Sequence, residues 1–226
     1  MVENLSILNT EVDFDIETNN SDRAAMVLKS VVGAAPVVGP LLNEVITSVI
    51  PNQKQERIIH FLGIFANKVK FLEKDVFEAK IKTEEFTDLL EDALRQASRA
   101  LTDDRKEYIA SLLKNSIVEE KLTHIQKKRL LDILNELNDA EIIRLKSCEY
   151  RDEARMAFFE KHTEVLEPWK RQDSSQESKD RVTFWESLTS KLISTGVLDD
   201  HRNITGMGRL LLRFIASDEE NQEVRI

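Results

Sequence analysis

Hydrophobic residues recur along most of this chain at the spacing of one face of an α-helix. The clearest example is 53–74, where the following side chains share one side: Ile58, Phe61, Leu62, Phe65, Val69 and Leu72. The same spacing predicts a helix at 83–101 and another that follows a cap at Asp103 or Asp104. The apolar side of this later helix carries Tyr108, Ile109, Leu112, Leu113 and Ile117.

Two capping boxes mark further helix starts. Thr123 and Gln126 have the spacing in which a hydroxyl accepts from the third backbone amide while the amide side chain reaches back. Asn138 and Glu141 repeat this arrangement. We therefore expect one helix from Thr123 to Leu137 and a long charged helix from Asn138 to Leu166, ended by Pro168.

The pattern changes after this long helix. Residues 169–181 contain no aliphatic side chain, so we expect a loop or linker there. A helix at 182–194, a polar stretch after Gly196 and an amphipathic run at 209–215 follow. This order is similar to the end of a winged-helix module, in which the polar stretch forms a small hairpin.

The first 53 residues contain the least typical segments. Val12 to Glu17 alternate apolar with acidic residues, which is typical of a short edge strand or of a disordered segment that orders on a partner. A short helix is predicted at 23–32. In 30–53, Glu44 is the only charged residue, and the prolines and glycines interrupt the apolar run before a helix at 41–50.

This apolar segment has two interpretations. It forms a buried helical hairpin, or it is sequestered at rest and inserts into a bilayer or docks on a partner after activation. The second interpretation assigns the hinge to Pro36, Gly39 and Pro40. It assigns membrane or partner binding to Val31, Val32, Val37, Val38, Leu41, Leu42, Val45, Ile46 and Val49.

Composition agrees with a helical protein. Of 226 residues, 41% are hydrophobic and 32% charged, and six glycines and four prolines are too few for the turns of a β-sandwich or barrel. We expect an all-α fold: a multi-helix bundle at 23–166, a polar linker at 167–181 and a small helical or winged-helix-like module at 182–216. Acidic tails at 1–22 and 217–226 flank them.

The two tails carry the net charge of −9. They hold ten of the 41 acidic residues and one of the 32 basic residues, so the body between them is neutral. A neutral body argues against a general polyanion binder. The only nucleic-acid contacts we consider are Arg202, Arg209 and Arg213, and the alternative is that they pair with Asp199, Asp200 or the acidic tail.

Motifs of catalysis are absent from the sequence. There is no phosphate-binding glycine loop, no nucleophile elbow and no His-Glu-x-x-His, and the single cysteine excludes a disulfide framework and a cysteine-based zinc site. The remaining catalytic candidates each have a structural alternative, which we favour: Glu160, His162 and Glu164 (a solvated helix face), Asp199, Asp200 and His201 (turn chemistry) and Cys148 (a half-buried structural thiol). We expect no enzyme activity, no metal and no cofactor.

The order of features resembles a known family. The relevant segments are GAAPVVGPLLNEVI, ERIIHFLGIFANKVKFLE, RKEYIASLLKNSI, LLDILNELNDAEIIRL and TGMGRLLLRFI, which lie between residues 30 and 216. Together they are similar to bacterial all-helical phage-defence proteins of the abortive-infection alpha type. The resemblance implies a role in host or prophage immunity and supplies no active-site residues.

These observations lead to one expected function and one alternative. We expect a non-enzymatic interaction protein of phage defence with a protein partner, and conditional membrane engagement of 31–50 as an extension. The first base is Arg23, so no export signal is predicted and we expect a cytoplasmic protein, with peripheral contact at the inner membrane if 31–50 engages lipid. The alternative is a DNA-binding transcriptional regulator that uses 182–216. Homo-oligomerisation stays open.

Overall fold

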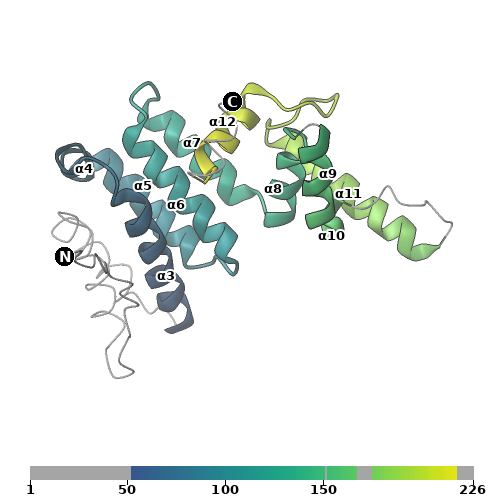
Figure 1. The fold of residues 1–226 in the computed structure, drawn as a ribbon, viewed down its shortest axis with the longest axis horizontal. Helices are drawn as coiled ribbons and strands as arrows, with labels where there is room; N and C mark the ends of the chain where they lie inside the picture. The colour runs from purple at the N-terminus through teal and green to yellow at the C-terminus, as the bar shows by residue number, and fades with distance from the viewer. Residues whose placement is uncertain (1–51, 151, 167–174, 218–226) are drawn as a thin grey trace, which may run out of the picture.

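The computed structural model describes residues 52–150, 152–166 and 175–217, and its regular elements there are all α-helices (Figure 1). The helices are α3 (Asn52–Val69), α4 (Lys74–Ile81), α5 (Glu84–Ala97), α6 (Asp103–Val118), α7 (His124–Glu136), α8 (Asp139–Lys146), α9 (Asp152–Lys161), α10 (Thr163–Leu166), α11 (Gln176–Ser194) and α12 (Gly206–Ile215). The expectation of an all-α fold is confirmed for these residues.

Helix α6 lies at the centre. It packs against α3, α5, α7 and α12, and Figure 1 shows it between these helices. Its residues from Ile109 to Leu113 are all buried, although consecutive residues of a helix point in different directions. The middle of α6 is therefore enclosed by its neighbours, and α6 organises the core.

The core continues into the C-terminal part of the chain. Buried side chains of α11, the turn after it and α12 join the same hydrophobic cluster as those of α3 to α8. The side-chain amide of Asn115 in α6 donates to the backbone carbonyl of Phe214 in α12, with a distance of 2.9 Å from Nδ2 to the oxygen. The division into 23–166 and 182–216 stays a prediction, and the buried core is continuous across it.

The helix starts follow local side-chain chemistry. Both capping boxes are confirmed: Thr123 with Gln126 opens α7, and Asn138 with Glu141 opens α8. The predicted cap of α6 was wrong, because the residue that accepts from the backbone amide of Arg105 is Thr102, through its hydroxyl (3.2 Å). Asp103 and Asp104 lie in the first turn, where the positive end of the helix dipole stabilises their negative charges.

The first described helix is shorter than expected. The prediction of one helix over 53–74 was wrong, because α3 ends at Val69 and α4 begins at Lys74. In the turn between them the amide of Leu72 donates to the carbonyl of Val69 (2.9 Å). The turn redirects the chain, and Phe77 and Ile81 of α4 are buried in the core. A straight continuation of α3 would carry these two side chains past the core.

The long helix predicted over 138–166 was also wrong. The chain forms α8, α9 and α10 instead. At the end of α8 the hydroxyl of Ser147 donates to the carbonyl of Arg144 (2.7 Å). The backbone amide of Cys148 donates to the carbonyl of Leu145, three residues back (3.0 Å). Such local bonds compete with the helical ladder and end it.

Part of the predicted linker is helical. The expectation of a loop through Arg181 was wrong from Gln176 onward, because α11 begins there with Ser175 as its cap. Arg181 pairs with Glu177 and the side chain of Gln176 donates to Asp180, both one turn apart. These i to i+4 contacts stabilise a polar turn that buries little. The elements predicted before residue 52 lie outside the described residues.

Candidate functional site

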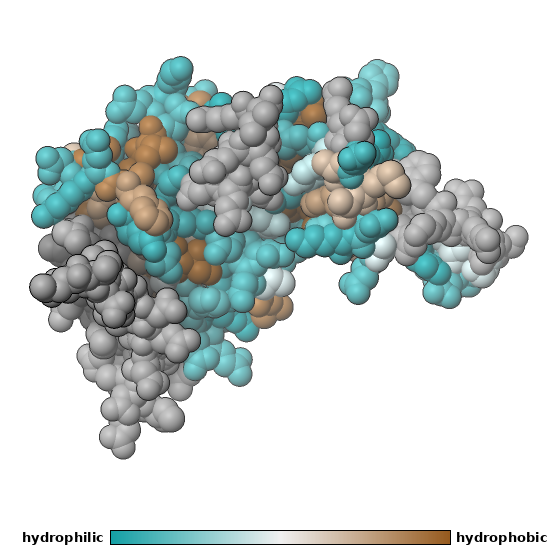
Figure 2. Space-filling view, viewed as in Figure 1, coloured by the Kyte–Doolittle hydropathy of each residue, from teal (hydrophilic) through white to brown (hydrophobic). Residues whose placement is uncertain are grey.

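The predicted membrane- or partner-binding residues lie outside the described part of the chain. This concerns the nine apolar residues from Val31 to Val49 and the hinge at Pro36, Gly39 and Pro40. Among the helices that are described, none has both the length and the apolar character required to cross a bilayer. Figure 2 shows a face on which hydrophilic teal predominates and brown to tan areas are separate from one another.

The three arginines considered for nucleic acid differ in their surroundings. Arg202 pairs with Glu186 (Nη2 to Oε2 2.9 Å), and Arg213 pairs with Glu119 (Nη2 to Oε2 3.5 Å). Their acidic partners come from α11 and from the residue after α6, and neither is Asp199 or Asp200. Arg209 is exposed on α12. Among the described residues, Arg209 is therefore the only one of these three arginines without an ion pair.

The Asp199–Asp200–His201 stretch forms a tight turn. One oxygen of Asp199 accepts from the amide of Asn203 (2.8 Å), and Leu198 and Ile204 form an isolated antiparallel bridge at its base. The hydrogen bond from the Asn203 amide lowers the pKa of Asp199 below its usual range. This is the turn chemistry that we favoured, and the described residues contain no group of three His, Cys, Asp or Glu side chains placed to hold a metal.

The cluster at the end of α9 is dispersed. Glu160 and Glu164 are exposed, whereas His162 is partly buried and its ring lies 4.5 Å from that of Phe158. Burial lowers the pKa of His162, Lys161 lowers it further, and Asp104 opposes both. The two glutamates and the imidazole do not form a catalytic pair, but the imidazole borders a cleft.

Cys148 is half-buried and packs against the core, as we favoured. A guanidinium nitrogen of Arg144 lies 2.8 Å from its sulfur and 3.1 Å from the hydroxyl of Ser147. The guanidinium of Arg144 also lies over the ring of Trp185, with 4.7 Å to the centroid. Through Arg144 these contacts join α8 to α11, and the thiol of Cys148 is one of the groups that hold the guanidinium in place.

A cleft of about 260 Å³ lies where α6, α8, α9 and the end of α12 converge; we call it the α6–α9 cleft. The side chains of α6 that line it follow the i, i+3, i+4, i+7 spacing of one helix face: Asp104, Glu107, Tyr108 and Ser111. The other walls include Lys146 of α8, Tyr150 after it, and Phe158, Lys161 and His162 at the end of α9. The cleft thus combines aromatic rings with charges of both signs.

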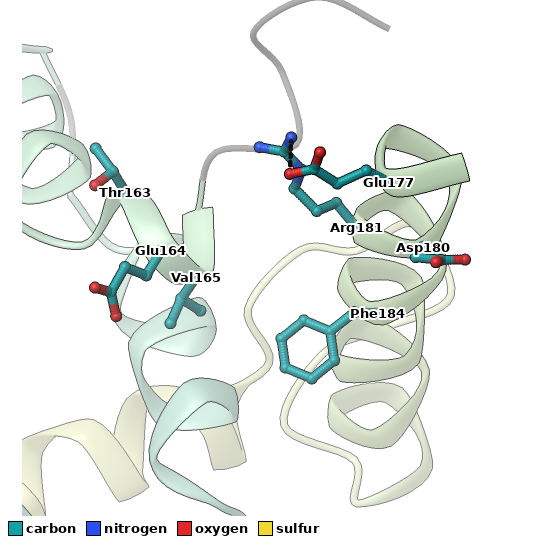
Figure 3. Close-up of a pocket in the computed structure, with 7 residues that line it drawn as sticks. All are labelled: Thr163, Glu164, Val165, Glu177, Asp180, Arg181 and Phe184. Carbon is teal, nitrogen blue, oxygen red and sulfur yellow. Dashed lines mark hydrogen bonds and ion pairs between the residues drawn. The ribbon is translucent and has the colours of Figure 1, made fainter. Parts of the chain in front are cut away.

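A larger groove of about 640 Å³ separates α10 from α11; we call it the α10–α11 groove (Figure 3). Phe184 points from α11 across the gap toward α10, on the side where Val165 lies, and its side chain is 50% exposed. The ion pair of Arg181 with Glu177 (2.9 Å) borders one end, and Asp180 points away. The groove has an apolar floor and a charged border.

Neither hollow was found from the sequence. The spacing of Asp104, Glu107, Tyr108 and Ser111 is a signal, because it places four side chains with polar groups on one side of the helix. Nothing local indicates that Lys146 and Phe158 meet that side. The position of Phe184 beside a groove was not predictable either, because the groove depends on α10, and the sequence pattern assigns the residues of α10 to a longer helix.

Comparisons with known proteins identify no relative. No family model, no curated protein and no solved structure matches this chain.

Proposed function

We propose that this protein is a non-enzymatic interaction protein that receives a protein partner in the α10–α11 groove. The observation that carries the proposal is Phe184, a half-exposed aromatic side chain that faces an apolar residue across a hollow. Aromatic side chains in such positions supply much of the binding energy of protein interfaces, and charged residues around them form a polar rim. The partner presents an apolar side chain to Phe184 and Val165.

The biological setting comes from the resemblance. A role in bacterial phage defence, in the cytoplasm, is proposed on the segments quoted above, which resemble abortive-infection alpha proteins. Conditional membrane engagement of 31–50 extends this proposal, because Glu44 is the only charge of that segment. Liposome flotation tests the membrane engagement alone. If the chain binds neither anionic nor neutral vesicles, in extracts of uninfected and of infected cells, membrane engagement of 31–50 is contradicted.

Phage plating tests the setting together with the groove. Expression of the chain in a bacterial host is expected to lower plating of a susceptible phage, and Phe184→Ser is expected to abolish the protection. Phe71→Ser is the matched control, because Phe71 is 81% exposed in the turn before α4 and lies outside the groove. Equal protection by all three chains places the acting surface elsewhere, and no protection from any phage in a broad panel contradicts the defence role.

Photocrosslinking tests the partner directly. A photoreactive phenylalanine analogue at position 184 is expected to yield one discrete protein adduct, and the same analogue at position 71 is expected to yield none. An adduct of two chains identifies a second copy as the partner. Equal, diffuse labelling at the two positions contradicts a specific contact in the groove.

A DNA-binding regulator is the second candidate. The observation that favours it is the order of α11, the antiparallel bridge of Leu198 with Ile204, and α12, which is the order of a winged-helix-like module with a very short hairpin. The exposed Arg209 adds one cation. A DNA shift that Arg209→Glu abolishes supports this candidate, and the ion-paired Arg213→Glu serves as comparison.

A further inference from the structure

The border of the α10–α11 groove is acidic. The charged side chains that line the groove are Glu164, Glu177, Asp180 and Arg181. Arg181 and Glu177 form an ion pair (2.9 Å from Nη2 to Oε1), in which their charges compensate each other. The carboxylates of Glu164 and Asp180 remain, one on α10 and one on α11, so each wall of the groove contributes one negative charge at its edge (Figure 3).

Neither of these two carboxylates has a cationic partner in the part of the chain that the structure describes. Glu164 and Asp180 are both exposed. The side-chain amide of Gln176 donates to Asp180 (2.7 Å), but this donor is neutral and leaves the negative charge in place. The two charges are therefore available to a partner.

The nearest cations along the chain do not change this balance. Lys179 lies two positions before Arg181, and residues at this spacing do not share a helix face, so Lys179 lies on another side of α11. Lys161 lines the α6–α9 cleft. Residues 167–174, which connect α10 to α11 in the sequence, contain two acidic and two basic residues and add no net charge.

The apolar floor and the acidic border match one kind of side-chain pattern. Phe184 is 50% exposed, and the face of an aromatic ring attracts cations as well as apolar groups. Lysine and arginine lay an aliphatic stem along an apolar surface and keep the charged end at its edge. A segment with an apolar residue for the floor and a base on either side of it therefore complements Phe184, Val165 and the two carboxylates together.

We propose that the partner docks in the α10–α11 groove through a basic segment, in which lysine or arginine flanks an apolar anchor. This inference rests on the proposed function, because it specifies the charge of the partner at the same groove. The groove volume of about 640 Å³ lies within the range of roughly 300–1,000 Å³ for ligand pockets, which leaves room for the anchor and the stem of a base. Opposite charges at a rim speed association and fix the orientation of the partner, and salt screens them.

Three labelled peptides of equal length test this preference by fluorescence anisotropy with the full chain. The basic peptide has a central leucine between pairs of lysines, the acidic peptide has glutamates in place of the lysines, and the third peptide keeps the lysines but has alanine in place of the leucine. The basic peptide is expected to bind about tenfold more tightly than either of the others at low salt. Its advantage over the acidic peptide is expected to disappear in about 1 M salt, where the Debye length is about 3 Å.

Charge reversal on the two walls provides the matched variants. The double variant Glu164→Lys with Asp180→Lys is expected to prefer the acidic peptide, and Glu164→Gln with Asp180→Asn is expected to lose the preference. The control is Glu120→Lys with Asp132→Lys, which changes the net charge as much as the first variant does, at exposed positions outside the groove. This control is expected to keep the preference for the basic peptide. Circular dichroism verifies that each variant is folded.

The results that overturn a basic partner differ from those that contradict the groove itself. Equal binding of the basic and acidic peptides, or an equal response of the two lysine double variants, overturns the inference. If Phe184→Ser weakens the binding of both peptides in that case, the groove still docks a partner and the proposed function stands. If Phe184→Ser changes the binding of no peptide, the groove is not the docking site, and both proposals are contradicted.

Two further outcomes also overturn the inference. The first is equal binding of the leucine and alanine peptides, because charge then acts without an apolar anchor. The second is a dimer of the chain, detected by sedimentation and abolished by Phe184→Ser, because it assigns the groove to a second copy of this chain.

Discussion

Arg105 Nε lies 2.8 Å from Asp139 Oδ1, and this ion pair joins the beginning of α6 to the beginning of α8. The guanidinium of Arg105 also donates to the backbone carbonyl of Leu134 (2.8 Å) and to that of Leu137. The second oxygen of Asp139 accepts from the hydroxyl of Thr102, the cap of α6. One arginine therefore holds the central helix to the α7–α8 junction.

Arg105→Ala is expected to lower the free energy of unfolding by about 2–3 kcal/mol, because a partly buried carboxylate and two backbone carbonyls lose a charged donor. Urea unfolding followed by circular dichroism measures the loss. Arg95→Ala is the matched control, because Arg95 pairs with Glu91 and Asp92 on the exposed side of α5 and is expected to cost less than about 1 kcal/mol. Equal losses would show that the Arg105 contacts contribute no more than a surface ion pair.

Gly208→Ala is expected to destabilise the protein by about 1–3 kcal/mol. A Cβ atom at this buried position of α12 would overlap the carbonyl oxygen of Val197 and lie 2.8 Å from Cγ1 of Ile204. Gly63→Ala, in the interior of α3 with no atom within 4 Å of the added Cβ, is expected to stabilise by about 0.5–1 kcal/mol instead. Thermal unfolding distinguishes the opposite signs, and a rise in Tm for both variants contradicts the close packing of α12.

Asp88→Asn is expected to remove a stabilising contribution that depends on pH. Hydrogen bonding by Lys128 is the main reason that the pKa of Asp88 lies below its usual range, and the same contact raises the pKa of Lys128. A carboxyl with a depressed folded-state pKa stabilises the fold above its unfolded pKa of about 3.9, and this stabilisation is lost as the pH falls through the folded value.

Urea unfolding at pH 6 and at pH 3 tests this expectation. The stability difference between the native chain and Asp88→Asn is expected to be larger at pH 6 and to shrink at pH 3. The exposed Asp132→Asn, on α7, controls for the general effect of removing a negative charge. A difference that is the same at both pH values would mean that the contact with Lys128 does not couple Asp88 to folding.

Thr123→Ala and Asn138→Ala are each expected to cost about 1 kcal/mol, because each removes the side-chain acceptor of a capping box. Thr87→Ala is the control, since Thr87 lies inside α5 and its hydroxyl donates to the carbonyl of Thr83 one turn back (3.1 Å). Alanine at such an interior position is neutral or stabilising. Chemical denaturation of the three variants measures the differences, and a loss for Thr87→Ala equal to the others would remove the special role of the caps.

Local chemistry was predictable where a few neighbouring residues decide the outcome. The boxes of Thr123 and Asn138 were found because all their partners lie within four positions. The break after Val69 was missed because the apolar spacing continues to Leu72, and the break after Lys146 was missed because no glycine or proline lies between Asn138 and Pro168. Only the burial of Phe77 and the bonds around Ser147 show why the chain turns. Polar contacts one turn apart, such as Glu177 with Arg181, extended α11 into a stretch without aliphatic residues.

By itself, the sequence determined the helical class, the buried sides of α3 and α6 and the caps that open α7 and α8, because these depend on composition and on spacing within single helices. Tertiary structure alone decided that Arg105 reaches Asp139, that Phe184 faces Val165 across a groove, and that Tyr108, Lys146 and Phe158 border one cleft. These residues are separated by tens of positions or by a turn that the periodicity does not mark. Their meeting is fixed by how the helices pack around α6, and that packing minimises exposed apolar area over the whole chain rather than over any one segment.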